Sequence, residues 1–397
     1  MTEQMDATIT RDMTDTQRIG AAIRERRTAL RLSQKGLADA AGLPAAQTVS
    51  EIEKGERELK AVELVRVARA LHTYPDVLLA VDAAAPAAEP RVLWRRGVRA
   101  KDRVREAQLL ERARRYAQLE AWCNEVALRT LPDYAFDPAV ATPHAVEHLA
   151  ERVRKELDLG PIPARTLVKT LEEDFGVKIF YDHLTRDTDG DCSAACVRGE
   201  FGAAILMDAS EAPWRQAFNF AHEVFHLVTW SAVERAWTAS GATDDREPAW
   251  YKMLEQLADH FASNLLMPGE SLTERYDAKA RAGKPSRFDL AQLAVDFGVS
   301  TQALVIRLEA LRRLTRTEKD VLRADLALQQ ASRALRPGRA PIRVPFPERY
   351  ETLAHTAYFR REIGKSVVAK YLETSVAALA DLHLPTTDVS EAAASPS

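Results

Sequence analysis

The sequence predicts a mainly α-helical protein with an α+β core (helices around a small sheet), an all-α N-terminal domain and a helical C-terminal region. Three observations lead to this prediction. Apolar residues recur at helical spacing along most of the chain. Two short segments rich in β-forming residues, 177–182 and 203–208, interrupt that pattern. Proline-rich breaks separate the helical blocks, and 397 residues exceed one typical core, so we expect several domains.

The breaks divide the chain into four predicted parts. The first part, residues 1–82, holds several short helices from Ile19 to about Ala80 and ends at the Ala/Pro-rich stretch AAAPAAEP. Residues 83–143 hold that stretch as a linker, followed by a long basic helix over residues 101–130 that the proline-rich segment TLPDYAFDPAVATP breaks. Residues 144–280 form the α+β core. Residues 281–397 are helical again, with two amphipathic runs around FGVS and a tail that we expect to be disordered, because it has too few apolar residues to offset its ordering entropy.

The core is expected to begin with helices over 144–157 and 164–175, because Gly176 then stands at a helix C-cap position. The two strand segments follow. Helical spacing returns over 214–230 and 249–266, with the polar break GATDDREP between them. We expect the functional site on these last two helices.

Composition indicates a soluble, cytoplasmic protein. The polar, acidic N-terminus lacks the features of a signal peptide, and no run reaches the roughly 18 apolar residues that cross a bilayer, so we expect no membrane association. The odd count of cysteines (Cys123, Cys192 and Cys196) fits a reducing compartment. We interpret them as reduced structural thiols; Cys192 and Cys196 as metal ligands are the alternative.

The net charge of −3 hides a strongly basic stretch over residues 91–115. An Arg-rich stretch of this kind either lies near nucleic-acid phosphates or forms a solvated helix face. The sequence leaves both interpretations open.

The strongest chemical signal is FAHEVFHLV, in which His222, Glu223 and His226 form the pattern HExxH on a predicted helix. Histidines at i and i+4 project from one helix face, so both imidazoles can bind one Zn²⁺. Glu223 then falls beside the metal, where its carboxylate can act as general base toward water and return the proton to a leaving amine. The alternative is a pair of histidines satisfied inside a core.

A catalytic zinc usually has three protein ligands, so a third must come from elsewhere. The best candidate is Glu255 in MLEQLADHFASNLLMP, on the next predicted helix. Asp259 follows one turn later on the same face, where it can accept the free ring N–H of His222 and orient that ring. His260 is the alternative third ligand, although it faces elsewhere on the helix. An exposed acidic helix face would also explain Glu255 and Asp259.

The segment from Glu147 to Pro268 resembles the ImmA/IrrE family of metallopeptidases. LAERVRKELDLGPIPARTLVKTLEEDFGVKIF, FNFAHEVFHLV and LEQLADHFASNLLMP match that family in order and spacing. The resemblance implies helices around a small twisted sheet, with His222, His226 and Glu255 as metal ligands and Glu223 as catalytic base. FGVSTQALVIRL resembles the helix-turn-helix-like element that follows the core in such proteins.

The chain departs from that family at Phe225, where members often carry Gly; Phe225 either narrows the cleft or repacks it. DTDGDCSAA, residues 187–195, looks like the family's segment preceding an edge strand, which would bind substrate backbone by strand addition. His183, Tyr181 and Tyr251 are the candidates for stabilising an oxyanion.

The segment IRERRTALRLSQKGLADAAGLPAAQTVSEIEKGERELKAVELVRVARAL resembles the XRE-type (lambda-repressor-like) helix-turn-helix domain. Ser33 caps its second helix. The resemblance implies that the third helix enters the major groove of double-stranded DNA. The predicted base-facing residues are Gln47, Thr48 and Ser50, and the predicted phosphate contacts are Gln34, Lys35 and Lys54.

The third helix of that domain also carries Glu51 and Glu53 and no Arg, and acidic groups near phosphates weaken binding. A protein-interaction or dimerisation use of the same fold is therefore the alternative to DNA binding. A homodimer through this domain is expected by analogy.

Two functions follow from these features. The first is a regulatory zinc metallopeptidase with a DNA-binding domain, which cleaves a transcriptional repressor with a related helix-turn-helix domain in a stress or mobile-element response, as the resemblance implies. The second is a DNA-binding regulator whose peptidase-like domain senses a ligand or metal without cleaving. The intact Glu223 favours the enzyme, because a scaffold has no need of that carboxylate.

Overall fold

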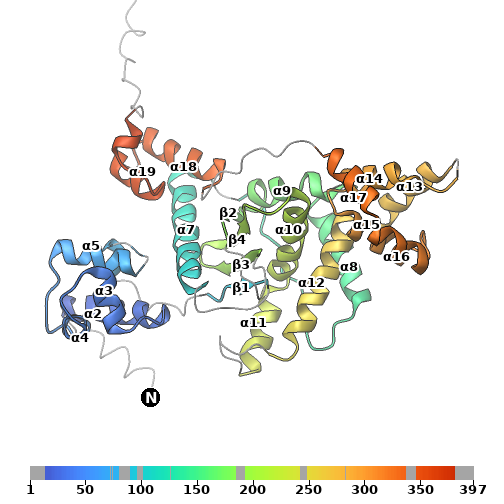
Figure 1. The fold of residues 1–397 in the computed structure, drawn as a ribbon. Coiled ribbons are helices and arrows are strands. Elements are labelled where there is room, and N and C mark those ends of the chain that lie inside the picture. Colours follow the sequence, from blue (N-terminus) through green and yellow to red (C-terminus); the bar gives the residue numbers. More distant parts are fainter. Residues whose placement is uncertain are drawn as a thin grey trace, which may run out of the picture. The chain divides into compact units, whose positions relative to one another are not determined.

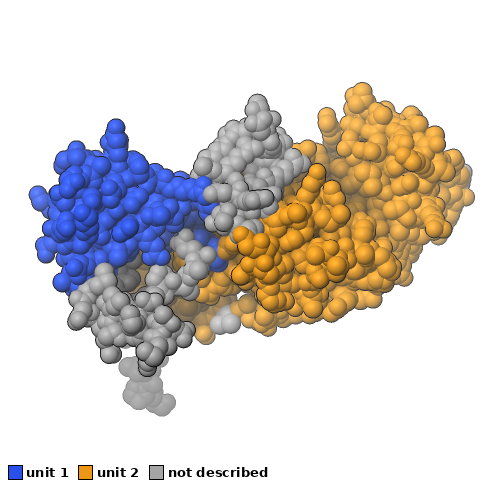
Figure 2. All heavy atoms as spheres, turned by 90° about the horizontal axis from the view of Figure 1, so that it is seen from below, with its two compact units in different colours: residues 1–90, 98–113 blue, residues 91–97, 114–397 orange. Residues whose placement is uncertain are grey.

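A computed structural model describes residues 14–71, 73, 75–79, 90–95, 102–125, 127–184, 193–241, 248–281, 283–336 and 346–380. The chain forms two compact units, one made of residues 1–90 and 98–113 and one made of residues 91–97 and 114–397 (Figure 2). Helices dominate both, and one small sheet lies in the second (Figure 1), so the predicted fold class is confirmed. The predictions for Cys192, the Ala/Pro-rich linker and the C-terminal tail lie outside the described residues.

The first unit packs short helices around one apolar core, which includes Ile23, Leu37, Val49 and Val67. Its helices are α2 (Asp15–Ala29), α3 (Gln34–Ala41), α4 (Ala46–Glu53), α5 (Ala61–Ala70) and α6 (Pro75–Leu79).

Local chemistry sets the ends of α3 and the approach of α2 to α4. The Ser33 hydroxyl accepts a hydrogen bond from the Gly36 backbone N–H at 2.9 Å, as expected of an N-cap. Gly42 ends α3 in the left-handed conformation, with φ of 60°. At Gly20 a side chain would force the two helices apart, because a Cβ atom there would lie 2.2 Å from the Ile52 carbonyl oxygen.

The second unit is built around a four-stranded sheet with the order β1-β3-β4-β2. Its strands are β1 (Leu93–Trp94), β2 (Lys178–Asp182), β3 (Ala194–Gly199) and β4 (Gly202–Asp208). β2 pairs parallel with β4, while β3 pairs antiparallel with both β4 and β1. The two strands expected from local sequence patterns form as β2 and β4, β3 begins where the resemblance placed a further strand, and β1 is additional.

Two helices place the candidate site against this sheet. α10 (Pro213–Val228) packs on β3 and β4, and α12 (Tyr251–Leu266) packs along α10 (Figure 1). α8 (Pro143–Glu156) covers the other side of α12. From Asn219 to Val228 every residue of α10 is buried, which explains why this stretch is apolar apart from its motif residues.

The second unit has further α-helices in its described part. They are α9 (Leu167–Glu173), α11 (Trp230–Ala239), α13 (Gly269–Ala280), α14 (Arg287–Asp296), α15 (Thr301–Ala310), α16 (Arg316–Ala324), α17 (Leu326–Ala334), α18 (Glu348–Phe359) and α19 (Lys365–Tyr371).

α7 (Asp102–Cys123) runs from one unit into the other. It ends before the proline-rich break that was expected to stop it near residue 130, and Asn124 follows it in the left-handed conformation with φ of 53°. No helix among the described residues is long and apolar enough to cross a bilayer.

Candidate metal centre and nucleic-acid interface

α10 and α12 bring His222, His226 and Glu255 together. The two Nε2 atoms of the histidines lie 3.2 Å apart. Glu255 Oε2 lies 3.3 Å from His222 Nε2, and Glu255 Oε1 lies 3.1 Å from His226 Nε2. Each residue thus offers one ligand atom, all within 4.8 Å of one another.

This donor set fits zinc. Ligand atoms held about 2.0–2.1 Å from a tetrahedral ion are separated from each other by about 3.3 Å, which is close to the spacings of these three atoms. Both histidine side chains are almost fully buried, and His226 Nδ1 has no hydrogen-bond partner among the described residues. Two ring nitrogens that face each other can share at most one proton, so a shared cation satisfies them better than a hydrogen bond does.

Asp259 orients one of the histidines. Its Oδ1 lies 2.9 Å from His222 Nδ1, so an N–H at Nδ1 donates to the carboxylate and leaves Nε2 free to face His226 and Glu255. Burial disfavours the His222 cation, but the hydrogen bonds to Asp259 and Glu255 outweigh it and raise the pKa of His222. Burial likewise raises the pKa of Glu255, yet the two histidines lower it overall.

A residue that the sequence did not single out completes this arrangement. Arg95 donates to Asp259 Oδ1 at 2.8 Å and also hydrogen-bonds to Asn219 Oδ1, one turn before His222. Arg95 is 164 residues from Asp259 along the chain, so no local pattern could have paired them.

Glu223 is fully buried beside the three ligand candidates. Neither carboxylate oxygen has a hydrogen-bond partner of normal geometry within the described ranges, although the Cys196 thiol, a weak donor, interacts with it. Burial raises the pKa of Glu223, while His222 and His226 lower it, and burial prevails. A carboxyl group poised in this way is suited to proton transfer.

The other sequence-based candidates are not among these metal-ligand residues. His260 is not one of them, and its surroundings are Arg307, Glu147 and the Pro143 backbone. The Tyr251 hydroxyl donates to the Trp94 carbonyl oxygen at 3.3 Å, and His183 is exposed. Tyr181 packs against Phe220, with ring centroids 6.3 Å apart.

Burial decides between the alternatives left open for Phe225 and for Cys196. Phe225 is fully buried between Phe136 and Phe261, at centroid distances of 5.2 and 5.4 Å, so the residue repacks the core and does not narrow a cleft. Cys196 is a free, buried thiol outside the cluster of metal-ligand atoms.

The expectation of a free edge strand beside the metal is wrong at residues 195–196. β1 already pairs there, with Leu93 opposite Cys196 and Trp94 opposite Ala195. Trp94 is 1% exposed, and the Arg95 backbone N–H donates to the Ala194 carbonyl oxygen at 3.2 Å. A substrate strand could add at this position only by displacing the chain's own segment.

In the first unit, the predicted DNA-contact residues lie on α3 and α4, except Lys54, which is the C-cap of α4. Gln47 is exposed, whereas Thr48 and Ser50 are half-buried. Lys35 and Lys54 are exposed and available to phosphates.

Gln34 takes part in a structural network instead of pointing freely outward. Its side-chain amide donates to Glu53 at 2.9 Å, and Arg27 pairs with the same carboxylate at 2.5 Å. Glu53 is therefore buried and neutralised, and the expectation that it would repel phosphates is wrong. Glu51 accepts a hydrogen bond from Gln47 at 3.2 Å and is the acidic group that remains at this surface.

The basic stretch over residues 91–115 is only partly solvated. Arg112 and Arg115 are buried, and Arg114 pairs with Glu200 at 2.6 Å. Within its described part, this stretch therefore supports neither a continuous phosphate-binding surface nor a fully solvated face.

Comparisons with known proteins agree with both resemblances. A family model for the IrrE N-terminal-like domain matches residues 170–309, and a helix-turn-helix model matches residues 23–78. The first match extends through α14 and α15, beyond the segment that carried the resemblance in the sequence. No curated protein matches the chain.

Among solved structures, a Mycobacterium tuberculosis transcriptional regulator is similar, with 18% identity and a TM-score of 0.30, over 52% of this chain and 54% of that one. This chain thus spans about half the length of that protein. On the family models, the chain joins an XRE-type helix-turn-helix domain to an IrrE-like domain of the ImmA/IrrE family.

Proposed function

We propose that this chain is a regulatory zinc metallopeptidase that acts in the cytoplasm, cleaves a protein substrate and binds double-stranded DNA through its N-terminal domain. One observation carries the proposal: two buried histidines and the half-buried Glu255 stand beside a buried carboxylate, Glu223, whose oxygens have no hydrogen-bond partner of normal geometry in the described part of the chain. A carboxylate that only stabilised the fold would be paired, because burying it alone is costly.

Each residue has a distinct role in this proposal. His222, His226 and Glu255 hold the zinc, which when bound supplies Lewis acidity and lowers the pKa of water to about 7. Glu223 accepts a proton from the attacking water and delivers it to the leaving amine. Asp259 holds the His222 ring in position, and Arg95 holds Asp259.

The substrate that fits best is a transcriptional repressor with a related helix-turn-helix domain, in a stress or mobile-element response, as the family resemblance implies. A homodimer through the N-terminal domain accompanies this proposal. The alternative is a DNA-binding regulator whose IrrE-like domain senses a ligand or metal without cleaving. The two domains found by comparison support a DNA-binding regulatory protein in either case.

The first experiment is metal content, measured by mass spectrometry on protein purified without added metal. We expect about one zinc per chain, lost in His222→Ala and in Glu255→Ala. His260→Ala is the matched control, because His260 lies on α12 but outside the cluster. If His260→Ala loses zinc as His222→Ala does, or no variant changes the content, the ligand set is wrong.

The second experiment separates the two functions. Cells producing wild type are compared with cells producing Glu223→Gln by mapping new protein N-termini. We expect Glu223→Gln to keep its zinc and to lose the cleavage products. Cleavage that persists in this variant would remove Glu223 from the mechanism, and the absence of any product in wild type would favour the sensing regulator.

A further inference from the structure

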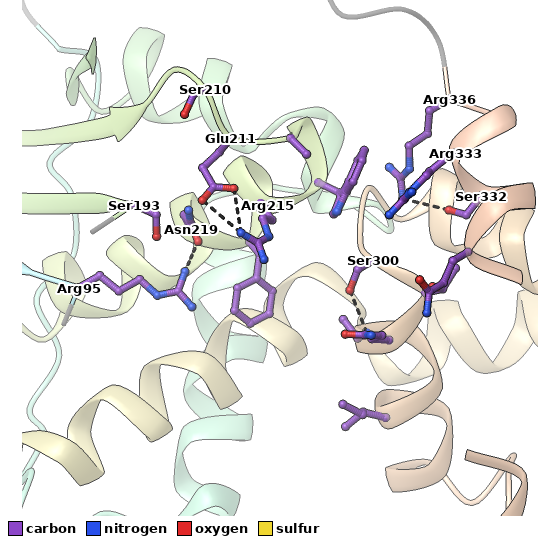
Figure 3. A pocket seen from close by; sticks show the side chains of 18 residues that line it. Arg95, Ser193, Ser210, Glu211, Arg215, Asn219, Ser300, Ser332, Arg333 and Arg336 are labelled. Carbon is purple, nitrogen blue, oxygen red and sulfur yellow. Dashed lines mark hydrogen bonds and ion pairs between the residues drawn. The ribbon is translucent and has the colours of Figure 1, made fainter. Parts of the chain in front are cut away.

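A large pocket opens beside the candidate metal centre but does not contain its residues. Its volume is about 780 Å³, within the range of small-molecule sites. It lies between the N-terminal end of α10, the N-terminal end of α15 and the helix α17 (Figure 3). None of His222, Glu223, His226 and Glu255 lines it.

The walls of the pocket are strongly cationic. Arg95, Arg215, Arg333 and Arg336 line it, and Glu211 is the acidic residue among the lining side chains. Figure 3 shows Arg95 and Arg215 on one side and Arg333 and Arg336 on the other. Four guanidinium groups around one space repel each other unless an anion lies between them.

The arginines on α17 and just after it have no anionic partner in the described part of the chain. Arg333 is exposed and makes no ion pair there. Arg336 donates to the Val299 carbonyl oxygen at 2.5 Å and stacks over Trp214, with 4.3 Å to the ring centroid. Burial lowers the pKa of Arg336 with no carboxylate to oppose it.

On the opposite wall, Arg215 is paired but remains accessible. It lies 3.4 Å from Glu211, and its side chain is 58% exposed. Arg95 reaches into the pocket from the end of β1 while holding Asp259.

The start of α15 adds polar donors to the same space. Ser300 caps the helix by accepting from the Ala303 N–H at 3.1 Å, and residues 300–303 line the pocket. The first backbone N–H groups of a helix have no intrahelical acceptor and carry partial positive charge. They favour a phosphate group over a carboxylate, because the phosphate offers more acceptor oxygens and about two negative charges.

We propose that this pocket binds a phosphorylated small molecule about the size of a mononucleotide. The phosphate lies between Arg333, Arg336 and the start of α15, where the two arginines have no anionic partner among the described residues. The rest of the ligand fills the remaining space toward Phe218 and Ile306, the latter 44% exposed. Such a ligand would supply what a sensing function needs, but its binding does not depend on the proposed peptidase activity.

The test uses the full chain, freed of metal with a chelator so that zinc cannot bind the probe. AMP is titrated calorimetrically at constant ionic strength, with adenosine as the uncharged comparison. We expect saturable binding of one AMP per chain and none of adenosine. Arg333→Glu should weaken AMP binding by at least about tenfold. Arg323→Glu is the matched control, since Arg323 is an exposed arginine on the neighbouring helix α16, outside the pocket. This variant should bind AMP with the affinity of wild type.

Several outcomes overturn the proposal. They are the absence of saturable AMP binding, an equal loss of AMP affinity in Arg333→Glu and Arg323→Glu, and binding of adenosine as strong as that of AMP. His222→Ala keeps the two proposals distinguishable: it should lose zinc and retain AMP affinity. If an acidic peptide saturates the pocket while AMP does not, the space is part of the substrate cleft and the assignment is wrong.

Discussion

Replacing Glu223 by glutamine should stabilise the metal-free protein while removing its proposed catalytic base. Glu223 is fully buried, and its two oxygens have no hydrogen-bond partner of normal geometry in the described structure. Burial raises the pKa of this carboxyl above that in the unfolded chain, so its ionised form opposes folding. Glutamine keeps the size of the side chain and removes the charge.

The magnitude follows from the buried charge, because glutamine at this position also lacks hydrogen-bond partners and removes only the additional cost of the ionised form. A buried polar group without its hydrogen bond costs about 1–3 kcal/mol, and more when it is charged. His222 and His226 offset part of that cost by lowering the pKa of Glu223. We therefore expect Glu223→Gln to raise the free energy of unfolding by about 1–3 kcal/mol. At about 2–4 °C per kcal/mol for a domain of this size class, Tm should rise by several degrees.

The pH dependence has a definite sign. In wild type the folded state holds the Glu223 proton to higher pH than the unfolded state does, so its stability falls as pH rises above the unfolded value of about 4.3. The increase in the free energy of unfolding caused by Glu223→Gln should therefore be small near pH 4.5 and largest near pH 8. Thermal unfolding of chelator-treated protein at both pH values measures it.

Glu211→Gln is the matched control. Glu211 is 2% exposed, in the same unit, but it is paired with Arg215 at 3.4 Å. Removing its charge should lower Tm, because Arg215 loses its partner. If Glu223→Gln lowers Tm as Glu211→Gln does, Glu223 is a structural carboxylate and the reasoning from its missing partners is refuted.

Three further predictions test other parts of the molecule. Asp259→Asn should weaken zinc binding by about 10–100-fold in a chelator competition, because His222 loses its orienting acceptor; unchanged affinity would remove Asp259 from this role. Burial raises the pKa of Glu172 to about 7. As pH rises from about 4.3 to 7, the free energy of unfolding of wild type should therefore fall by about 1–3 kcal/mol relative to that of Glu172→Gln. Parallel curves of stability against pH for the two proteins would contradict this. Gly20→Ala should unfold the helix-turn-helix domain, because its Cβ atom would meet the Ile52 carbonyl oxygen at 2.2 Å. This variant should lose binding to double-stranded DNA while its zinc content stays constant. Retained DNA binding would show that the helices can separate at little cost.

Features encoded within one helix could be predicted from the sequence. The i, i+4 spacing of His222 and His226 places both on one face whatever surrounds the helix. Ser33 at the start of α3 and the strand segment over 178–182 also follow from local preferences, and the structure contains both. The same holds for the helical character of α10 and α12, whose apolar residues repeat at helical spacing.

Tertiary structure decided which groups became partners. β1 is two residues long, too short for any strand signal, and it exists because Leu93 and Trp94 pair with β3. Glu53 looked like a surface charge but is buried against Arg27 and Gln34, which lie on other helices.

Sequence patterns were enough to predict the helical fold class, the helix-turn-helix segment and the residues that could bind a metal. Packing between segments far apart in the chain decided the rest: Arg95 against Asp259, Phe225 inside the core, and the cationic pocket between α10, α15 and α17. The physical reason is that propensity and periodicity act over a few neighbouring residues. A partner for a charge or a wall for a pocket is supplied by whichever distant side chain the fold brings near.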